Sequence, residues 1–401
     1  MKNIFIIPFL AFTISVSAQK VEEKIVKDYV YTLASDDFKG RGTSEEGEKK
    51  AADYIEKQLK KLKISPKGEN GTYFQDFKFV YEEKDRTGKN VIGFIDNKAE
   101  NTIIIGAHYD HLGLGNDGNS RDANPKGKIH NGADDNASGV AGILEIARVL
   151  NQNKIQEKHN YLFLFFSAEE LGLIGSKYFS NNPLIDFTKV NCMINLDMVG
   201  RLDSAKNLAI SGIGTSPKWS EILNKENNNR FQLKFDSAGT GASDHTSFYL
   251  KDLPVLHFFT GTHQDYHKPS DDAELINYKG EVEVIQYIID VVTALDANEK
   301  LTFSKTKTSA ATGGRKKYKV TMGIMPNYMS DGTGLAIDGV TEGNAAFNAG
   351  IKEGDVLVQI DEMTITDIQT YMQALGKYEK GQTVKVKVVR EGKPLTFDLT
   401  F

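Results

Sequence analysis

Four stretches of the chain are almost continuously apolar and rich in β-branched and aromatic residues. They are residues 102–107 (TIIIGA), 160–167 (NYLFLFFS), 190–196 (VNCMINL) and 255–259 (VLHFF). Because apolar and polar positions do not alternate within them, these stretches are typical of strands that are buried on both faces. The pattern therefore predicts four strands inside a sheet that is covered on both sides.

Apolar residues recur at helical spacing in segments around these strands. Between positions 45 and 62 they stand three or four residues apart, with Lys and Glu between them: Ala51, Ala52, Ile55, Leu59 and Leu62. Residues 21–33 also predict an amphipathic helix. Residues 138–150 predict a further helix, with its apolar side chains on one side. Residues 72–95 alternate like strands joined by polar turns. Strands that alternate with helices predict an open α/β sheet covered by helices.

The first 18 residues have the pattern of a secretory signal peptide. Lys2 gives a positive start, residues 4–16 are almost continuously apolar, and small residues at positions 15–18 precede Gln19. The alternatives are a buried N-terminal strand or a membrane anchor, but this run is short for a bilayer span and no later run is long enough. We therefore expect residues 1–18 to be removed and the protein to be exported, to the periplasm or to the medium.

The composition of the chain changes after about Asp296. Residues 298–317 are rich in Lys, Thr, Ser and Gly, which predicts a solvated linker. Residues 318–401 contain short strands and turns. A chain of 401 residues is long enough for two domains, so we expect a large one at 19–297 and a small one at 318–401.

The net charge and the cysteine content limit the partners and the metal ligands that the chain can have. The net charge of −5 provides no general basic surface, so nucleic acid is not an expected partner. Cys192 is the single cysteine, which leaves no internal disulfide and no thiolate zinc site. Any bound metal must therefore be held by histidines and carboxylates.

Acidic and histidine residues follow each of the four apolar runs. In chain order they are His108 and Asp110, then Glu169 and Glu170, then Asp197, and finally His267 in the loop beyond the fourth run. In open α/β sheets, ligands gather in the crevice outside the carboxyl ends of the strands. We therefore expect these side chains to converge at one edge of the sheet.

A Gly-rich loop before the helix at 138–150 carries Asp134 and Asp135. Either aspartate could be an ordinary helix N-cap. Together with the other strand-end residues, the loop instead predicts a carboxylate that bridges two metal ions. Of the adjacent Glu169 and Glu170, one would bind metal while the other acts as a base.

Six segments resemble the successive motifs of the co-catalytic di-zinc aminopeptidases, whose relatives include glutamate carboxypeptidase II and the glutaminyl cyclases. The segments are AHYDHLG, NGADDNASGV, SAEELGLIGS, NLDMVGR, GASDHTSF and DYHKPSDD. They occur in the family's order over roughly residues 30–295 and are far more specific together than singly. The resemblance implies a zinc-exopeptidase fold with a mixed, mainly parallel sheet covered by helices.

The resemblance also implies a role for each matched position. Two zinc ions would be held by His108, Asp135, Glu170, Asp197 and His267, with Asp135 as the bridge. Glu169 would be the general base, Asp110 the partner that orients His108, and Tyr266 a group that helps to hold the tetrahedral intermediate. Lys268 and Asp272 depart from the family, where threonines are common, and make His267 the least secure ligand.

The remaining histidines receive no catalytic role. We interpret His111, His130, His159 and His245 as structural and assign nothing to His257 and His263. A serine-hydrolase site is excluded because no G-x-S-x-G turn follows a strand.

The implied reaction is hydrolysis of the N-terminal peptide bond by a metallo-exopeptidase, through a metal-bridging water and a glutamate base. The implied substrates are peptides with a free N-terminus. Two alternatives are a single-zinc enzyme of the glutaminyl cyclase kind and a non-catalytic peptide-binding protein. The presence of Glu169 speaks against the second.

Residues 318–401 resemble a PDZ domain of the bacterial protease type. Residues 322–325 (MGIM) match the loop and strand start that bind a peptide carboxylate, and AAFNAGIKEGDVLVQIDEMTI matches a short helix, a Gly-Asp turn and two strands. The resemblance implies a site for the C-terminus of a peptide or partner protein. The alternative is a small β-domain that packs against the large domain and binds nothing.

Overall fold

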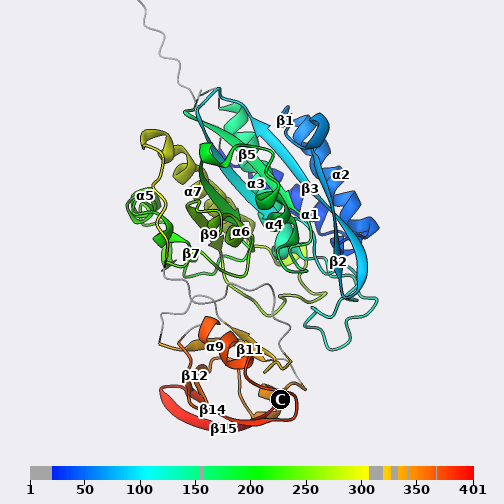
Figure 1. The fold of residues 1–401 in the computed structure, drawn as a ribbon, viewed down its shortest axis with the longest axis vertical. Coiled ribbons are helices and arrows are strands. Elements are labelled where there is room, and N and C mark those ends of the chain that lie inside the picture. The colour runs from blue at the N-terminus through cyan, green and yellow to red at the C-terminus, as the bar shows by residue number, and fades with distance from the viewer. Residues whose placement is uncertain are drawn as a thin grey trace, which may run out of the picture.

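The computed structural model describes residues 20–153, 155, 157–306, 319–326, 333–340, 343–366 and 368–401. Within them lie a nine-stranded and a six-stranded sheet, each with hydrophobic clusters of its own (Figure 1). The predicted signal peptide and residues 307–317 of the predicted linker lie outside the described residues. No helix in the described part of the chain is long and apolar enough to cross a membrane.

The centre of the large sheet consists of four parallel strands. In spatial order they are β5 (His159–Phe166), β4 (Asn101–His108), β6 (Val190–Leu196) and β9 (Val255–Phe259). These are the four predicted apolar runs, each matched to within one residue at either end. Almost all of their residues are buried, as the continuous apolar pattern predicted.

Strands at both sides complete a mixed sheet. On one side β3 (Lys84–Ile95) runs antiparallel to β5 and pairs with β2 (Phe74–Tyr81) and the short β1 (Ser65–Pro66). On the other side β7 (Asn207–Ser211) runs antiparallel to β9, and β8 (Gln232–Asp236) is parallel to β7. The strands predicted between residues 72 and 95 are confirmed as β2 and β3.

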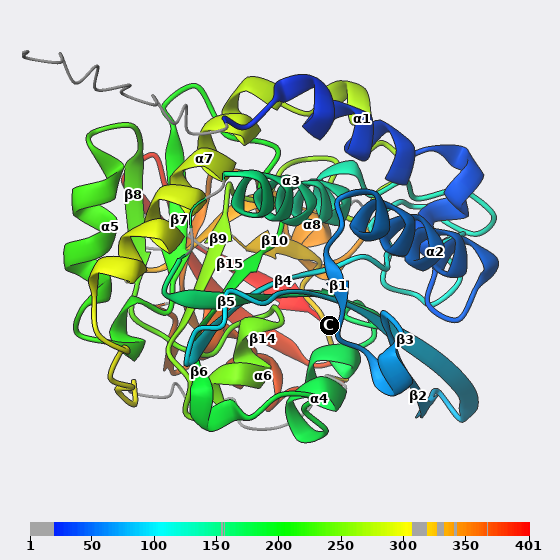
Figure 2. The same ribbon diagram turned by 90° about the horizontal axis from the view of Figure 1, so that it is seen from above.

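Helices cover both faces of the large sheet (Figure 2). One face carries α1 (Glu23–Leu33), α2 (Glu46–Lys61), α3 (Gly139–Gln152) and α7 (Tyr278–Ala294), whose apolar residues join one core cluster. The opposite face carries α4 (Ile174–Asn181) and α6 (His245–Tyr249), and α5 (Trp219–Asn227) packs beside α7. The three helices expected from apolar spacing are confirmed as α1, α2 and α3.

The predicted linker begins too early. Leu301 is only 5% exposed, and its backbone N–H donates to Oδ1 of Asn191 at 2.8 Å. The backbone N–H of Ser304 donates to the carbonyl of Thr215 at 2.8 Å. Residues 298–306 therefore follow the surface of the large domain, because its polar groups accept the amides of Leu301 and Ser304 and Leu301 packs into its hydrophobic cluster.

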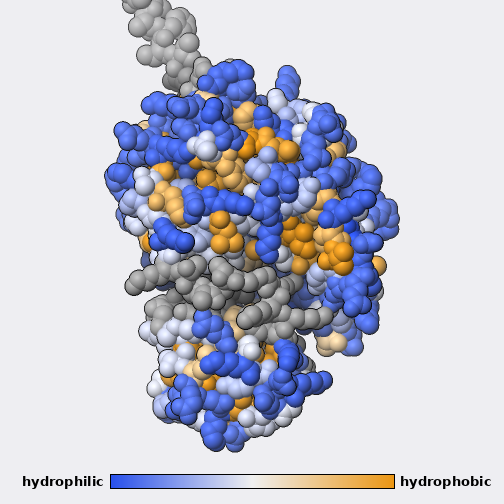
Figure 3. All heavy atoms as spheres, viewed as in Figure 1, coloured by the Kyte–Doolittle hydropathy of each residue, from blue (hydrophilic) through white to orange (hydrophobic). Residues whose placement is uncertain are grey.

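The small sheet lies within the second domain. Its strands are β10 (Ile324–Pro326), β11 (Leu335–Val340), β12 (Val356–Ile360), β13 (Met363–Thr364), β14 (Thr383–Arg390) and β15 (Lys393–Thr400), with helices α8 (Ala345–Ala349) and α9 (Ile368–Leu375). Arg390 makes a two-armed ion pair with the buried Asp355, with nitrogen–oxygen distances of 2.6 and 2.8 Å. This pair fixes the predicted Gly-Asp turn against the end of β14. On the face shown in Figure 3, each domain carries apolar patches interspersed with hydrophilic side chains.

Candidate metal centre

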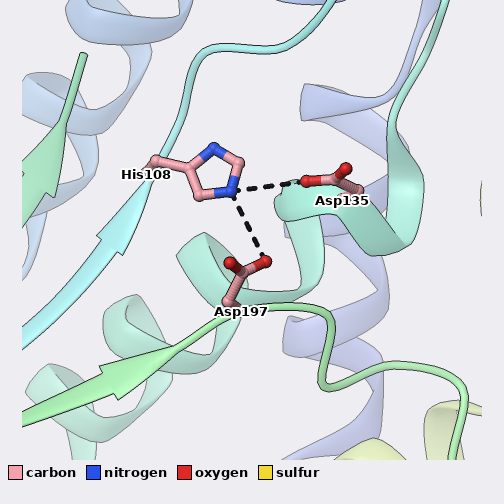
Figure 4. Close-up of side chains that lie close together, drawn as sticks. All are labelled: His108, Asp135 and Asp197. Atoms are coloured by element: carbon pink, nitrogen blue, oxygen red, sulfur yellow. Dashed lines mark ion pairs between the residues drawn. The ribbon is translucent and has the colours of Figure 1, made fainter. Parts of the chain in front are cut away.

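Three of the predicted ligands meet at the carboxyl end of β4. His108 is the last residue of β4, Asp135 lies in the loop before α3, and Asp197 directly follows β6. Nε2 of His108 is 3.3 Å from Oδ1 of Asp135 and 3.4 Å from Oδ1 of Asp197 (Figure 4). The three ligand atoms are close enough together to hold one metal ion.

A second group surrounds the other oxygen of Asp135. Nε2 of His267 is 3.1 Å from Oδ2 of Asp135 and 3.2 Å from Oε2 of Glu170. Nδ1 of His111 is 2.8 Å from Oε1 of Glu170 and 3.8 Å from Oδ2 of Asp135. The two oxygens of Asp135 therefore face different groups, which is the geometry of a carboxylate shared by two ions.

The structure brings in His111, which the sequence interpretation treated only as structural. His111, Asp135 and Glu170 form a group whose ligand atoms could hold a metal ion. The hydrogen bond between Nδ1 of His111 and Oε1 of Glu170 leaves Oε2 of Glu170 facing His267. The sequence showed that His111 lies on the same strand-end loop as His108 but not where its side chain points.

Other histidines have hydrogen-bond partners away from these groups. His130 is bonded to the hydroxyl of Ser120 at 2.7 Å, and His159 is bonded to Asp296 at 2.7 Å. Such contacts are those of structural histidines.

Backbone hydrogen bonds position Asp135. The carboxylate of Asp271 accepts the N–H groups of Asp134 and Asp135, at 3.0 and 3.1 Å. Asp134 makes no side-chain cap on α3; its Oδ1 accepts the N–H of Gly200 at 2.7 Å. The N-cap alternative for this loop is therefore not what the structure shows.

Asp110 contacts His108 through its main chain more closely than through its carboxylate. Nδ1 of His108 is 3.1 Å from the carbonyl oxygen of Asp110 and 3.8 Å from its Oδ1. The carboxylate accepts the N–H of Glu169 at 3.0 Å and the hydroxyl of Thr43 at 2.8 Å. Burial raises the pKa of Asp110 to about 6. Asp110 thus orients His108 by a carbonyl and Glu169 by a carboxylate.

Glu169 belongs to neither ligand group. Burial raises the pKa of Glu169 well above its usual range; nearby His108 opposes this rise and Asp244 adds to it. A carboxylate whose pKa is raised binds a proton more readily, which suits a group that must take up a proton during the reaction. Its position beside the ligands, without being one of them, suits the predicted base.

Charge pairing dominates the second group. Burial disfavours the charged form of His267, yet the Glu170 carboxylate raises its pKa to about 10. Burial likewise disfavours the charged form of Glu170, yet His267 and His111 hold its pKa at about 2. A buried set of carboxylates and imidazoles requires protons or cations for neutrality, and divalent cations would displace these protons. Imidazole and carboxylate are also ordinary zinc ligands, so the residues present fit zinc.

Tyr266 and the S-D-H segment lie close to this centre. The ring of Tyr266 is 4.0 Å from that of His267, measured between centroids. His245 is buried and stacks on His257 at 4.6 Å with an interplanar angle of 7°. The role of Tyr266 toward an intermediate stays a prediction.

Comparison with known families gives two matches. The sequence model described as "Peptidase family M28" matches residues 90–292, and the one described as "PDZ domain" matches residues 320–401. The first match contains all the candidate ligands, and the second coincides with the small sheet.

Curated relatives align with the large domain. The chain is 27% identical over 246 residues to leupeptin-inactivating enzyme 1 of Streptomyces exfoliatus, which covers 61% of this chain and 49% of that protein. It is 28% identical over 226 residues to aminopeptidase YwaD of Bacillus subtilis, covering 52% and 44%. It is 32% identical over 190 residues to leucine aminopeptidase 2 of Trichophyton rubrum, covering 43% and 36%. The chain therefore spans half or less of the length of these relatives.

Solved structures share the fold of the large domain. A glutaminyl cyclase of Bacteroides thetaiotaomicron aligns with a TM-score of 0.58 and 20% identity, over 71% of this chain and 100% of that one. A zinc aminopeptidase of Bacillus subtilis aligns with a TM-score of 0.56 and 17% identity, over 70% and 96%. At these identities the likeness establishes the fold.

Proposed function

Because the chain belongs to peptidase family M28, we propose that its large domain is a zinc-dependent aminopeptidase. It hydrolyses the N-terminal bond of peptides with a free N-terminus. The observation that carries this function is the shared carboxylate of Asp135, which has one oxygen toward His108 and the other toward His267. The aminopeptidases among the curated relatives support it.

We expect two zinc ions in this centre. His108, Asp135 and Asp197 would hold one, and Asp135, Glu170 and His267 the other. When bound, a pair of zinc ions supplies Lewis-acid chemistry, polarising a carbonyl and making a water more acidic.

The protein's own groups then move the proton. Glu169 accepts a proton from the attacking water and returns it to the leaving amine. The Asp110 carboxylate holds the backbone of Glu169, so the base keeps its place at the end of β5 during both transfers. We expect Tyr266, whose ring lies against that of His267, to donate a hydrogen bond to the tetrahedral intermediate.

The relatives named as aminopeptidases support a substrate with a free α-ammonium group. The proposed substrates are therefore peptides that present a free N-terminus.

The PDZ domain is proposed to bind the C-terminus of a peptide or of a partner protein. Gly323 has a φ of +72° and lies just before β10, in the segment that resembles a carboxylate-binding loop. Backbone N–H groups of such a loop bind a terminal carboxylate while the peptide adds a strand to the sheet.

We also propose export of the protein, on the sequence pattern of residues 1–18. N-terminal sequencing of protein from its native host should give Gln19 as the first residue. An intact Met1 would contradict export through this signal.

Glutaminyl cyclisation is the second candidate, because glutaminyl cyclases share the fold. The complete second ligand group, with Glu170 and His267 against Asp135, favours the peptidase. A panel of aminoacyl reporters and an N-terminal glutamine peptide separates the two. We expect chelator-sensitive reporter hydrolysis. Cyclisation of the glutamine peptide without reporter hydrolysis would contradict the aminopeptidase proposal.

A further inference from the structure

Arg41 is fully buried and donates only to backbone carbonyls in the hydrogen bonds described. Its Nε donates to the carbonyl of Tyr109 at 2.8 Å. Nη1 donates to the carbonyls of Leu33 at 2.7 Å and Asn131 at 2.6 Å, and Nη2 donates to that of Gly132 at 2.8 Å. One guanidinium therefore joins three separate segments of the chain.

Two of these segments carry candidate metal ligands. Tyr109 stands directly after His108, and Gly132 stands three residues before Asp135. The loop that carries His108 is thus tied through one side chain to the loop that carries the shared carboxylate.

The backbone around Arg41 makes further bonds to the His108 loop. The N–H of His111 donates to the carbonyl of Arg41 at 3.1 Å, and the N–H of Gly113 donates to that of Gly40 at 2.9 Å. A Cβ on Gly40 would lie 2.5 Å from the Gly113 and His130 carbonyl oxygens, so this contact requires glycine. Residues 40–43 are built against the metal centre although they lie outside the family match, which begins at residue 90.

Asp271 binds N–H groups of the same loop, whereas Arg41 binds its carbonyl groups. It is fully buried, and its Oδ2 accepts the N–H groups of Asp134 and Asp135. Its own carbonyl accepts the N–H of Ala133 at 2.9 Å. Because Asp271 follows His267 by four residues, it links the loop of that histidine to the loop of Asp135.

We propose that Arg41 and Asp271 are a pair of positioning residues that hold loop 131–135 by its carbonyls and by its amides. Together they set the position of Asp135 relative to His108 and His267, and thereby the affinity of both zinc sites. The inference rests on the proposed zinc centre.

The charges of the pair suit this role. Burial lowers the pKa of Arg41 to about 10, so the guanidinium is still charged at neutral pH. Its charge lies among the carboxylates of Asp135, Asp271 and Asp110, which offsets their mutual repulsion. Lysine would keep the charge but offers one donor atom, which cannot reach carbonyls in three segments.

The test compares two variants with two matched controls. Arg41→Lys and Asp271→Ala change the pair; alanine is chosen because asparagine would keep an oxygen able to accept both N–H groups. Arg148→Lys changes another buried arginine, which is bonded to Glu145 and to the carbonyl of Lys20. Asp296→Ala changes another aspartate, which accepts the N–H of Lys158 and is bonded to the imidazole of His159.

Four measurements on the full-length protein distinguish positioning from folding: zinc affinity by competition with a chromophoric chelator, the visible spectrum after Co²⁺ substitution, thermal unfolding without metal, and the kinetics of reporter hydrolysis. We expect Arg41→Lys and Asp271→Ala to bind zinc about 10- to 100-fold more weakly and to alter the Co²⁺ spectrum. We expect kcat to fall more than KM changes. Both controls should keep wild-type zinc affinity and spectrum, whatever their loss of stability.

Zinc affinity within twofold of the wild type in Asp271→Ala, or an equal loss in the controls, would overturn the inference. If Arg41→Lys does not fold, Asp271→Ala alone tests the inference, because it removes the oxygen that accepts both N–H groups. A wild-type protein that binds two zinc ions but cleaves no peptide would refute the proposed function and leave this inference standing.

Discussion

Nε2 of His267 lies 3.1 Å from Oδ2 of Asp135, although one residue comes from the loop after β9 and the other from the loop before α3. Parallel strands explain this meeting, because β4, β6 and β9 deliver their carboxyl ends to the same edge of the sheet. The departures from the family at Lys268 and Asp272 therefore do not move the histidine away from the centre. The geometry supports His267 as a ligand.

Glu169→Gln should lose about 10²- to 10⁴-fold in kcat on an aminoacyl reporter, because the amide cannot accept the proton of the attacking water. The zinc content and the melting temperature should stay close to those of the wild type, since Glu169 lies outside both ligand groups. Reporter kinetics and metal analysis on the same preparation check this. Near-normal turnover in the variant would show that another group is the base.

Glu170→Ala should lower the zinc content toward one ion per chain, because His108 and Asp197 still hold the other ion with Asp135. His111→Asn should weaken the second ion by less, about tenfold, since it removes only the imidazole that contacts Oε1 of Glu170. Zinc titrations of the metal-free variants measure both effects. An equal loss of zinc affinity in the two variants would instead show that His111 binds the second ion directly.

Much of this centre could be predicted from the sequence because its ligands stand directly after continuous apolar strands. The rule for the ends of parallel strands predicted that His108, the Glu169–Glu170 pair and Asp197 would converge, whereas the family resemblance was needed to separate Glu170 as the ligand from Glu169 as the base. His111 was missed because a histidine one position past an H-x-D motif has no fixed direction in the sequence. Arg41 and Asp271 were missed because their partners are backbone groups of distant loops, which leave no pattern of spacing.

The predicted start of the linker differs from the structure for a related physical reason. A stretch rich in Lys, Thr and Ser predicts solvation, but residues 301–306 lie along the large domain. Leu301 and Phe303 pack against its hydrophobic clusters. The packing of these two apolar side chains outweighs the average composition of the segment.

Glu48→Gln should change how stability depends on pH. Burial raises the pKa of Glu48 from 4.5 to about 8, and nearby Asp110 adds to the rise. Between these pH values the folded protein keeps a proton that the unfolded chain loses, so the free energy of unfolding falls as pH rises. Glutamine removes this fall, about 1.4 kcal/mol per pH unit for one proton.

Urea unfolding of the metal-free proteins from pH 5 to 9 tests this prediction. The stability of Glu48→Gln relative to the wild type should grow up to about pH 8 and then stay constant. Parallel pH profiles for the two proteins would show that Glu48 does not carry a buried proton.

Truncation after Thr306 should keep the large domain folded and hydrolysis of small reporters largely intact. The candidate ligands end at His267, and this cut retains the packing of Leu301. Longer peptides or partner proteins should be processed more slowly without the PDZ domain. Complete loss of reporter turnover in a folded, zinc-loaded truncation would show that the PDZ domain contributes to the active site.

The rate of aminoacyl-reporter hydrolysis during addition of Zn²⁺ to the metal-free protein tests the central claim most directly. Because Asp135 is shared between the His108 group and the His267 group, we predict that the rate rises until two zinc ions per chain are bound. A rate that reaches its plateau at one ion per chain, or that does not depend on zinc, would contradict the two-zinc aminopeptidase.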